Sequence, residues 1–276
     1  MNINAICSDI DGTLLDSQRG LSPRTIRTIR SLENNFPVIL ASARMPSAMR
    51  HLQDELGILH HPMICFNGGY VLLYNEGADT PDVVDSVQIP LATCFDIVAM
   101  AQGSAIHISL YTEDNWYVPQ FDQWAEREEL HTKVSPEVSS LQMTLENWQK
   151  ADTGAHKVMC MGPEDEIAAL ADKLTHKLGD EIYIYRSKST YLELAPRSIS
   201  KATALEMILK ANYGIAMPEV MAFGDNYNDI EMLRAVGKGI AVGNARPEVK
   251  AAADELTLKS TDDGVAVAIE KYLLQK

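Results

Sequence analysis

The sequence is poor in cysteine, in basic residues and in long apolar runs. Its four cysteines, Cys7, Cys65, Cys94 and Cys160, are widely spaced and form no Cys-x-x-Cys, which argues against a disulfide framework and a cysteine-ligated zinc site. No apolar run approaches the roughly 18 residues that a membrane span needs, and no basic segment followed by an apolar one precedes Asp9. These absences predict a soluble, cytoplasmic protein with no membrane partner.

The charge balance also excludes a class of partners. Lys and Arg number 24 against 38 Asp and Glu, which gives a formal net charge of −14, and no block of basic residues is present. Such a chain repels polyphosphate backbones, so we expect no nucleic-acid partner. With 276 residues, 46% of them hydrophobic, the chain can form one large or two ordinary domains, and either a monomer or a homodimer fits.

Strands and helices alternate through the first 80 residues. Short apolar runs at 3–8, 38–41 and 63–66 predict buried strands, and helices are expected after Ser22-Pro23 and from Pro46. The third strand ends in the turn Asn67-Gly68-Gly69. The order β-α-β-α-β predicts a parallel sheet.

The pattern changes in the middle of the chain and then returns. Predicted strands at 106–111, 116–118, 156–161 and 182–185, with a helix through Ile167 and Leu174, indicate an inserted α+β unit. A helix from Ser200 and strands at 220–223 and 239–242 resume the first pattern. We therefore expect an α/β fold: a three-layer, Rossmann-like parallel-sheet core of residues 1–80 and 192–276, interrupted by a second domain at 81–191.

Two acidic clusters follow predicted strands. Asp9 and Asp11 come directly after the first strand, and Gly12 permits a sharp exit of the chain. Like charges at that range raise one pKa unless a cation neutralises them, which indicates a metal or a shared proton, whereas a solvated turn is the plainer alternative. Asp225, Asn228 and Asp229 follow the strand at 220–223, where a helix cap formed by Asp225 or Asn228 is the plainer alternative.

Ligand sites in open α/β sheets lie beyond the carboxyl ends of the strands, so these clusters are expected to meet. Ser42 ends the strand at 38–41 and offers a hydroxyl to an anion. Lys201 begins a helix, where a cation is unfavourable without an anionic neighbour, although a lone lysine is more often only solvated. Carboxylates, a hydroxyl, a lysine and a carboxamide at one edge of an acidic protein describe an Mg²⁺-assisted phosphoryl site.

At this point a family resemblance becomes specific. The runs Asp9-Ile10-Asp11-Gly12-Thr13-Leu14-Leu15 and Gly224-Asp225-x-x-Asn228-Asp229, with Ser42 and Lys201 between them, are similar to the four motifs of the haloacid dehalogenase-like superfamily. A large α/β insert between the second and third motifs resembles the superfamily's Cof-type phosphatases, in which the insert is a cap. Two departures, Ala41-Ser42-Ala43-Arg44 for Thr-Gly-Arg and Ala202 for glycine, remove no functional side chain.

The resemblance implies a role for each motif residue. Asp9 would be the nucleophile that forms an aspartyl-phosphate, and Asp11 the general acid and base, a task that calls for a raised pKa. Ser42, Lys201 and Asn228 would hold the phosphoryl oxygens. The cofactor Mg²⁺ would be bound by Asp9, the backbone carbonyl of Asp11 and Asp225, and Asp229 would brace the metal ligands or Lys201.

The implied function is Mg²⁺-dependent hydrolysis of a small phosphorylated metabolite, such as a sugar phosphate, with the cap supplying selectivity. His107, Trp116, Tyr117 and Arg186 are polar or aromatic candidates for the leaving-group contacts, although packing or surface roles suit each of them too. Two alternatives stay open. One is a phosphotransferase or phosphomutase that uses the same intermediate, and the other is a regulator that binds a metabolite without turnover.

Overall fold

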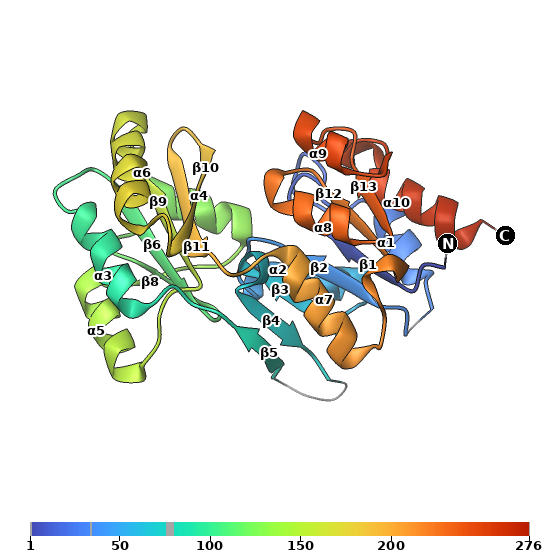
Figure 1. The fold of residues 1–276 in the computed structure, drawn as a ribbon, viewed down its shortest axis with the longest axis horizontal. Helices are drawn as coiled ribbons and strands as arrows, with labels where there is room; N and C mark the ends of the chain where they lie inside the picture. The colour runs from blue at the N-terminus through green and yellow to red at the C-terminus, as the bar shows by residue number, and fades with distance from the viewer. Residues whose placement is uncertain (1, 34, 76–79, 276) are drawn as a thin grey trace. The chain divides into compact units, whose positions relative to one another are not determined.

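The computed structural model describes residues 2–33, 35–75 and 80–275, and the chain divides into two compact units (Figure 1). The first unit comprises Met1–Arg44, Met49–Asp85 and Ile199–Lys276, and the second comprises Met45–Ala48 and Ser86–Ser198. The domain assignment made from the sequence, 1–80 with 192–276 against 81–191, stays a prediction.

The first unit contains an eight-stranded sheet in the order β14-β13-β12-β1-β2-β3-β4-β5. Neighbouring strands from β14 to β3 are parallel, and β4 is antiparallel to β3. The strands are β1 (Ala5–Ser8), β2 (Val38–Ala41), β3 (Met63–Cys65), β4 (Tyr70–Leu73), β5 (Asp82–Ser86), β12 (Val220–Gly224), β13 (Lys238–Ala241) and β14 (Glu255–Leu256).

In the described part of the chain, six α-helices connect or follow these strands: α1 (Pro23–Arg30), α2 (Ser47–Leu56), α7 (Lys201–Asn212), α8 (Ile230–Ala235), α9 (Pro247–Ala252) and α10 (Gly264–Ile269). The strand order runs from β1 to β3 in one direction and from β12 to β14 in the other. Right-handed crossovers therefore place α1 and α2 on one face and α8 and α9 on the opposite face. The contacts agree, because α1 packs against α10, whereas α8 packs against α7 and α9.

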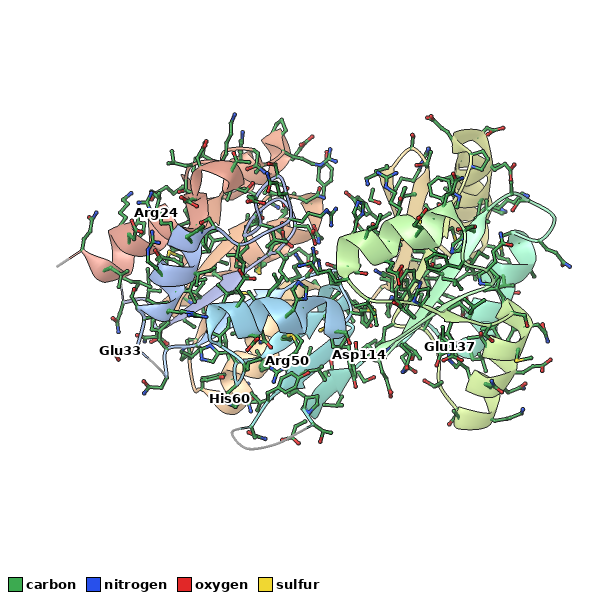
Figure 2. The ribbon with its side chains drawn as sticks, turned by 180° about the vertical axis from the view of Figure 1, so that it is seen from behind. Arg24, Glu33, Arg50, His60, Asp114 and Glu137 are labelled. Atoms are coloured by element: carbon green, nitrogen blue, oxygen red, sulfur yellow. The ribbon has the colours of Figure 1, made fainter. Side chains whose placement is uncertain are left out.

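A helix cap and an ion pair show how the sequence begins α1 and attaches it to the rest of its layer. Ser22 caps α1 by accepting a hydrogen bond from the backbone N–H of Thr25, and Pro23 occupies the first turn, as its fixed φ allows. Arg24, at the surface of α1 in Figure 2, donates two hydrogen bonds to Glu270. This two-pronged pair attaches α1 to the C-terminal helical segment Glu270–Leu274.

The central strands carry the site at their carboxyl ends. All four residues of β1 and of β2 are buried, and β1 pairs with β12 on one side and β2 on the other. In the β1–β12 register, Ser8 lies opposite Phe223, and the N–H of Asp9 donates to the carbonyl of Phe223. The acidic residues that follow the two strands therefore leave the sheet side by side.

The sheet is larger than the sequence pattern predicts. The predicted third strand ends at Cys65, because Phe66 already turns the chain with a positive φ. The chain then returns as β4, antiparallel to β3, and β5 is the edge strand beyond it. A uniformly apolar run of four residues after a turn carries no period from which its direction could be predicted.

The second unit contains a six-stranded sheet in the order β10-β11-β9-β6-β7-β8, antiparallel except for the parallel pair β7–β8. Its strands are β6 (His107–Thr112), β7 (Asn115–Val118), β8 (Glu137–Val138), β9 (Lys157–Met161), β10 (Ile182–Lys188) and β11 (Tyr191–Pro196), and its helices are α3 (Leu91–Met100), α4 (Gln123–Thr132), α5 (Leu141–Ala151) and α6 (Glu164–Leu178). The sequence pattern indicated α6 but not α3, α4 or α5.

The two faces of this second sheet differ in chemistry. Alternate residues such as Ile108, Val158 and Leu192 join one buried apolar cluster with side chains of α3, α5 and α6. The residues between them, such as His107 and Tyr191, point to the other face, where they contact Asp122 and Trp124 at the start of α4. One face is thus an ordinary apolar core, and the other is rich in polar and aromatic groups.

Among the described residues, no helix combines the length and the apolar character needed to cross a bilayer.

His156 is a buried titratable group of the second unit. Its Nδ1 accepts a hydrogen bond from the backbone N–H of Glu113 at 2.9 Å, and its Nε2 lies 3.0 Å from Ser86 Oγ. An accepting Nδ1 places the ring proton on Nε2, so the folded protein holds the neutral ring. Burial lowers the pKa of His156 from its usual 6.5 to about 4.

Acidification should therefore weaken the second unit. Between pH 6.5 and pH 4 the unfolded chain binds a proton at His156 that the folded chain excludes, so stability falls as pH falls. From pH 7 to pH 5 the loss due to this residue is about 2 kcal/mol. The non-titrating His156→Asn variant should show a correspondingly smaller change. Urea unfolding followed by the fluorescence of Trp116, Trp124 and Trp148 measures this, since all three tryptophans belong to this unit.

His176→Asn is the matched control, because His176 is exposed on α6, and its pH dependence should equal that of the wild type. An unchanged pH dependence in His156→Asn would contradict the account of the buried ring.

Candidate active site

Lys201 is fully buried between two carboxylates. Its Nζ lies 2.6 Å from Asp9 Oδ1 and 2.7 Å from Asp229 Oδ1. Ser200 caps the helix, so Lys201 is the first residue of α7, where the helix dipole disfavours a cation. Burial alone would lower the pKa of Lys201, but the charges of Asp229 and Asp9 and the hydrogen bonds to them raise it above its usual value. The anionic neighbour expected from the sequence is thus a pair of carboxylates.

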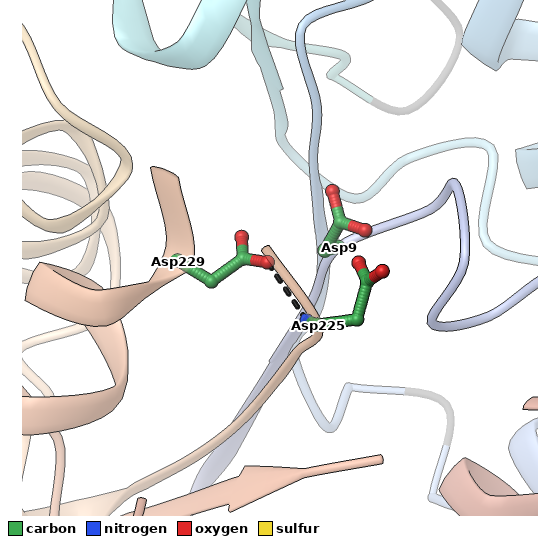
Figure 3. Close-up of side chains that lie close together, drawn as sticks. All are labelled: Asp9, Asp225 and Asp229. Atoms are coloured by element: carbon green, nitrogen blue, oxygen red, sulfur yellow. Dashed lines mark hydrogen bonds between the residues drawn. The ribbon is translucent and has the colours of Figure 1, made fainter. Parts of the chain in front are cut away.

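Asp225 completes a group of three carboxylates with Asp9 and Asp229 (Figure 3). One carboxylate oxygen from each lies within 4.8 Å of the others, and the carboxylates of Asp9 and Asp225 face each other. Thr13 Oγ1 donates to Asp225 Oδ1 at 3.1 Å. Gly12, at φ +84°, leaves the space that Asp225 occupies, since a Cβ there would lie 2.5 Å from Asp225 Oδ2.

The three carboxylates have different partners. Asp229 is buried, and its Oδ2 accepts hydrogen bonds from the backbone N–H groups of Asp225 and Asn226 while its Oδ1 accepts from Lys201. It therefore holds Lys201 and the loop after β12 in place. Asp9 and Asp225 are left as the two carboxylates facing each other.

Their electrostatics favour a bound cation. Burial and the charges of Asp229 and Asp225 raise the pKa of Asp9 well above its usual value, against the lowering effect of Lys201. Burial and the charge of Asp229 raise the pKa of Asp225 to about 6. Oxygen ligands at this spacing, each destabilised as an anion by burial and by a neighbouring carboxylate, are the donor set that a hard divalent cation requires. The group therefore fits a divalent metal.

Asp11 lies outside this group and is bound by two arginines. Arg44 Nε and Nη2 donate to the two oxygens of Asp11 at 2.7 and 2.8 Å, and Arg19 Nη1 donates to Oδ1 at 3.1 Å. Burial would raise the pKa of Asp11, but the hydrogen bonds and charge of Arg44, with the charge of Arg19, lower it below its usual value. The raised pKa expected for a general acid is therefore wrong for this conformation, because a two-pronged arginine pair stabilises the ionised carboxylate.

Ser42 and Asn228 lie beside neighbouring elements of the same sheet edge. Ser42 follows β2 and is buried, and its Oγ accepts the N–H of Arg44 at 3.3 Å. Asn228, in the helical turn Tyr227–Asp229, donates from Nδ2 to Asn67 Oδ1 at 2.9 Å. Lys201 joins Asp9 to Asp229, and Asn228 adjoins Asp229 in that turn, so residues distant in the sequence meet at this edge.

Four further residues contact the candidate site and had no role predicted from the sequence: Thr13, Arg19, Arg44 and Asn67. Thr13 belongs to the run from Asp9 to Leu15. Arg44 stands in the Ala41-Ser42-Ala43-Arg44 run and Asn67 in the Asn67-Gly68-Gly69 turn, so both had a visible signal but no assigned role. Arg19 had no signal in the sequence, since it precedes the first helix in an ordinary polar loop.

The four candidates for leaving-group contacts all lie in the second unit and have partners there. His107 pairs with Asp122 and Ser109, Trp116 stacks on Tyr111, Tyr117 meets Trp148 edge to face, and Arg186 donates to the carbonyl of Ser189. These contacts give each residue a structural role within that unit.

Comparison with known proteins now identifies the family. Residues 6–269 match the haloacid dehalogenase-like hydrolase family. The chain belongs to the haloacid dehalogenase-like hydrolases. The resemblance drawn from the four motifs and the expected α/β fold are thereby confirmed.

Named relatives and solved structures match over nearly the whole chain. The chain is 30% identical to the pyridoxal phosphate phosphatase YbhA of Escherichia coli, covering 99% of this chain and 100% of the relative. It is 28% identical to an HMP-PP phosphatase of Yersinia enterocolitica, covering 96% and 93%. The crystal structure of a haloacid dehalogenase-like hydrolase from Bacteroides thetaiotaomicron superposes with a TM-score of 0.87 at 28% identity, covering 98% and 99%. The expected enzyme class, a phosphatase of this superfamily, is confirmed.

Removing the buried ammonium should destabilise the first unit. In Lys201→Met, Asp9 and Asp229 would remain buried without their cation, so the free energy of unfolding at neutral pH should fall by about 3–5 kcal/mol. Chemical unfolding followed by far-ultraviolet circular dichroism measures the change.

Lys210→Met is the matched control, because Lys210 is exposed near the end of the same helix, and its loss should cost little. Equal stability of the two variants would show that Lys201 does not neutralise buried charge.

Proposed function

We propose that this haloacid dehalogenase-like hydrolase cleaves small phosphomonoesters in two steps, through an aspartyl-phosphate (an acyl phosphate) formed on Asp9. The observation that carries the proposal is the buried group in which Asp9 lies between Lys201 and Asp225 at the carboxyl end of β1. An isolated buried carboxylate would be costly, so this arrangement suits a group that must act as an anion.

In the first step, a carboxylate oxygen of Asp9 attacks phosphorus, and the bond from phosphorus to the leaving oxygen breaks. The charge of Lys201 lowers the electrostatic cost of bringing an anionic ester to Asp9. Without compensation, two unit charges about 4 Å apart repel by roughly 4 kcal/mol at an effective dielectric near 20. Ser42, Lys201 and Asn228 hold the phosphoryl oxygens in this scheme.

Asp11 moves the protons. It gives one to the leaving oxygen in the first step. In the second step it takes one from a water whose oxygen attacks phosphorus, while the bond from phosphorus to the Asp9 oxygen breaks and releases inorganic phosphate and the free Asp9 carboxylate. The ionised form favoured by Arg44 and Arg19 is the form needed to accept that proton. Its side chain is 40% exposed, so a proton can reach it from solvent before the first step.

The cofactor of the proposal is Mg²⁺, held by carboxylate oxygens of Asp9 and Asp225 and the backbone carbonyl of Asp11. When bound, it supplies positive charge that offsets the anions of the substrate and of the two aspartates. The raised pKa values of Asp9 and Asp225 support this assignment, since both carboxylates gain from a nearby cation.

The substrate class is a small phosphorylated metabolite. This part of the proposal rests on the relatives, which are named for pyridoxal phosphate and for HMP-PP. We further propose that the inserted second domain selects the leaving group, and that the enzyme acts in the cytoplasm on free metabolites rather than on nucleic acid.

A phosphate-release assay tests the proposal. Purified protein is incubated with pyridoxal phosphate, HMP-PP and a set of hexose phosphates, with Mg²⁺ or with EDTA. We expect Mg²⁺-dependent release of inorganic phosphate from at least one compound, and a loss of about a thousandfold or more in Asp9→Asn.

Asp54→Asn, the same change at an exposed position on α2, is the control and should keep wild-type activity. Full activity in Asp9→Asn would remove the nucleophile from the scheme. Turnover that depends on an added acceptor, without net phosphate release, would instead identify a phosphotransferase, and tight binding without turnover would identify a regulator.

A further inference from the structure

The turn that follows β3 has an uncommon backbone. Phe66 and Asn67 both have positive φ, 49° and 58°, and Gly68 follows at 109°. Two successive non-glycine residues in the left-handed region are rare, and a bulky aromatic residue there is strained. Such conformations persist only where the surroundings hold them, and they cluster at functional sites. We call residues 66–69 the Asn67 turn.

Backbone hydrogen bonds fix the Asn67 turn to the loop after β2. The N–H of Asn67 donates to the carbonyl of Ser42 at 2.8 Å, and the N–H of Phe66 donates to the carbonyl of Arg44 at 3.0 Å. Ser42 is a proposed phosphate ligand, and Arg44 holds Asp11. The strained backbone thus sets the position of two groups at the candidate active site.

The side chain of Asn67 reaches a second element. Its Oδ1 accepts the Nδ2–H of Asn228 at 2.9 Å, across 161 positions of sequence. This bond occupies one of the two Nδ2 protons of Asn228 and fixes the plane of its carboxamide. Because the amide group is planar, the direction of the second Nδ2 proton of Asn228 is then fixed as well.

Gly68 brings the same turn against a third element. A Cβ at Gly68 would lie 2.6 Å from the carbonyl oxygen of Ser200 and 3.3 Å from Ala204 Cβ. The turn therefore lies directly on the first turn of α7, which begins with Lys201. Ser42, Asn228 and Lys201 come from three separate segments, and the Asn67 turn contacts all three segments.

We propose that Asn67 is a positioning residue of the phosphate site, acting through Asn228: its side-chain oxygen orients the Asn228 carboxamide toward the phosphoryl group. The inference rests on the proposed function, because it assumes that Asn228 binds phosphate. Asn suits the position for two reasons, since it tolerates the left-handed backbone and supplies the acceptor.

A double-mutant cycle of Asn67→Gly and Asn228→Ala tests this. Glycine adopts positive φ freely, so Asn67→Gly removes the acceptor while the backbone of the turn can stay unchanged. Calorimetric titration with inorganic phosphate in the presence of Mg²⁺ gives a binding readout that needs no turnover. Steady-state hydrolysis of one phosphomonoester gives kcat and KM for each variant.

In the wild-type background, Asn67→Gly should weaken phosphate binding and lower kcat/KM by about tenfold, the size of one lost hydrogen bond with its orientation. The change should appear mainly in KM, because Asn228 contacts the phosphoryl group before and during transfer. In the Asn228→Ala background, the same substitution should change both quantities by less than about twofold, since coupled residues are not additive.

Asp152→Gly is the matched control. Asp152 also has a positive φ of 51°, at the exposed C-cap of α5 in the second unit, so it tests the effect of glycine in this conformation away from the site. Its phosphate binding and kcat/KM should equal those of the wild type. Thermal unfolding of Asn67→Gly should stay close to that of the wild type, which separates positioning from loss of fold.

The outcomes are distinct. Unchanged phosphate binding in Asn67→Gly, or effects of the two substitutions that multiply, would overturn the role of Asn67 while the wild type remains an active phosphatase. A wild type that neither binds phosphate nor hydrolyses any ester would overturn the proposed function, and this inference with it.

Discussion

The candidate site contains three closely spaced carboxylates and too little positive charge to neutralise them. One buried ammonium, Lys201, contacts two of them, and the third, Asp225, faces Asp9. Because burial and the charges of neighbouring carboxylates both disfavour the ionised form, the protein alone leaves the pKa values of Asp9 and Asp225 raised. The ionised forms of both carboxylates are favoured only when more positive charge is present. This one imbalance accounts for the affinity we assign to a divalent cation.

The fold positions these three carboxylates and the buried ammonium relative to one another. Strands β1 and β12 are neighbours and parallel, so the aspartates that follow them leave the sheet at the same edge. Gly12 admits the Asp225 carboxylate, and the backbone N–H groups after β12 hold Asp229 against Lys201. Asp11 differs because Arg44 and Arg19 supply its counter-charge. Two aspartates separated by a single residue thus have opposite pKa shifts.

Much of this could be predicted from the sequence, because the signals are local. Apolar runs that end in Asp9, Ser42 or Asp225 indicate buried strands followed by a polar loop, and parallel strands place those loops on one edge. The meeting of Asp9 and Asp225 follows from that topology. The anionic neighbour of Lys201 follows from a cation at a helix start.

The parts that could not be predicted depend on side-chain reach or on pairing direction. Arg44 binds Asp11 because a long guanidinium side chain turns back across the site, and no spacing rule encodes that direction. The bond between Asn67 and Asn228 joins two short amides whose distance depends on the packing of whole elements. Strand β4 consists of four apolar residues with no alternating pattern, so its antiparallel direction could not be predicted.

Chemical trapping of the phosphorylated carboxylate tests the central claim most directly. The enzyme is mixed with a hydrolysed phosphomonoester and Mg²⁺, quenched during turnover, reduced with borohydride, digested and sequenced by mass spectrometry. The account predicts homoserine in place of aspartate at position 9 and at no other position in the chain. Active enzyme that gives no reduced residue at position 9, or a reduced residue at Asp11 or Asp225 instead, would contradict it.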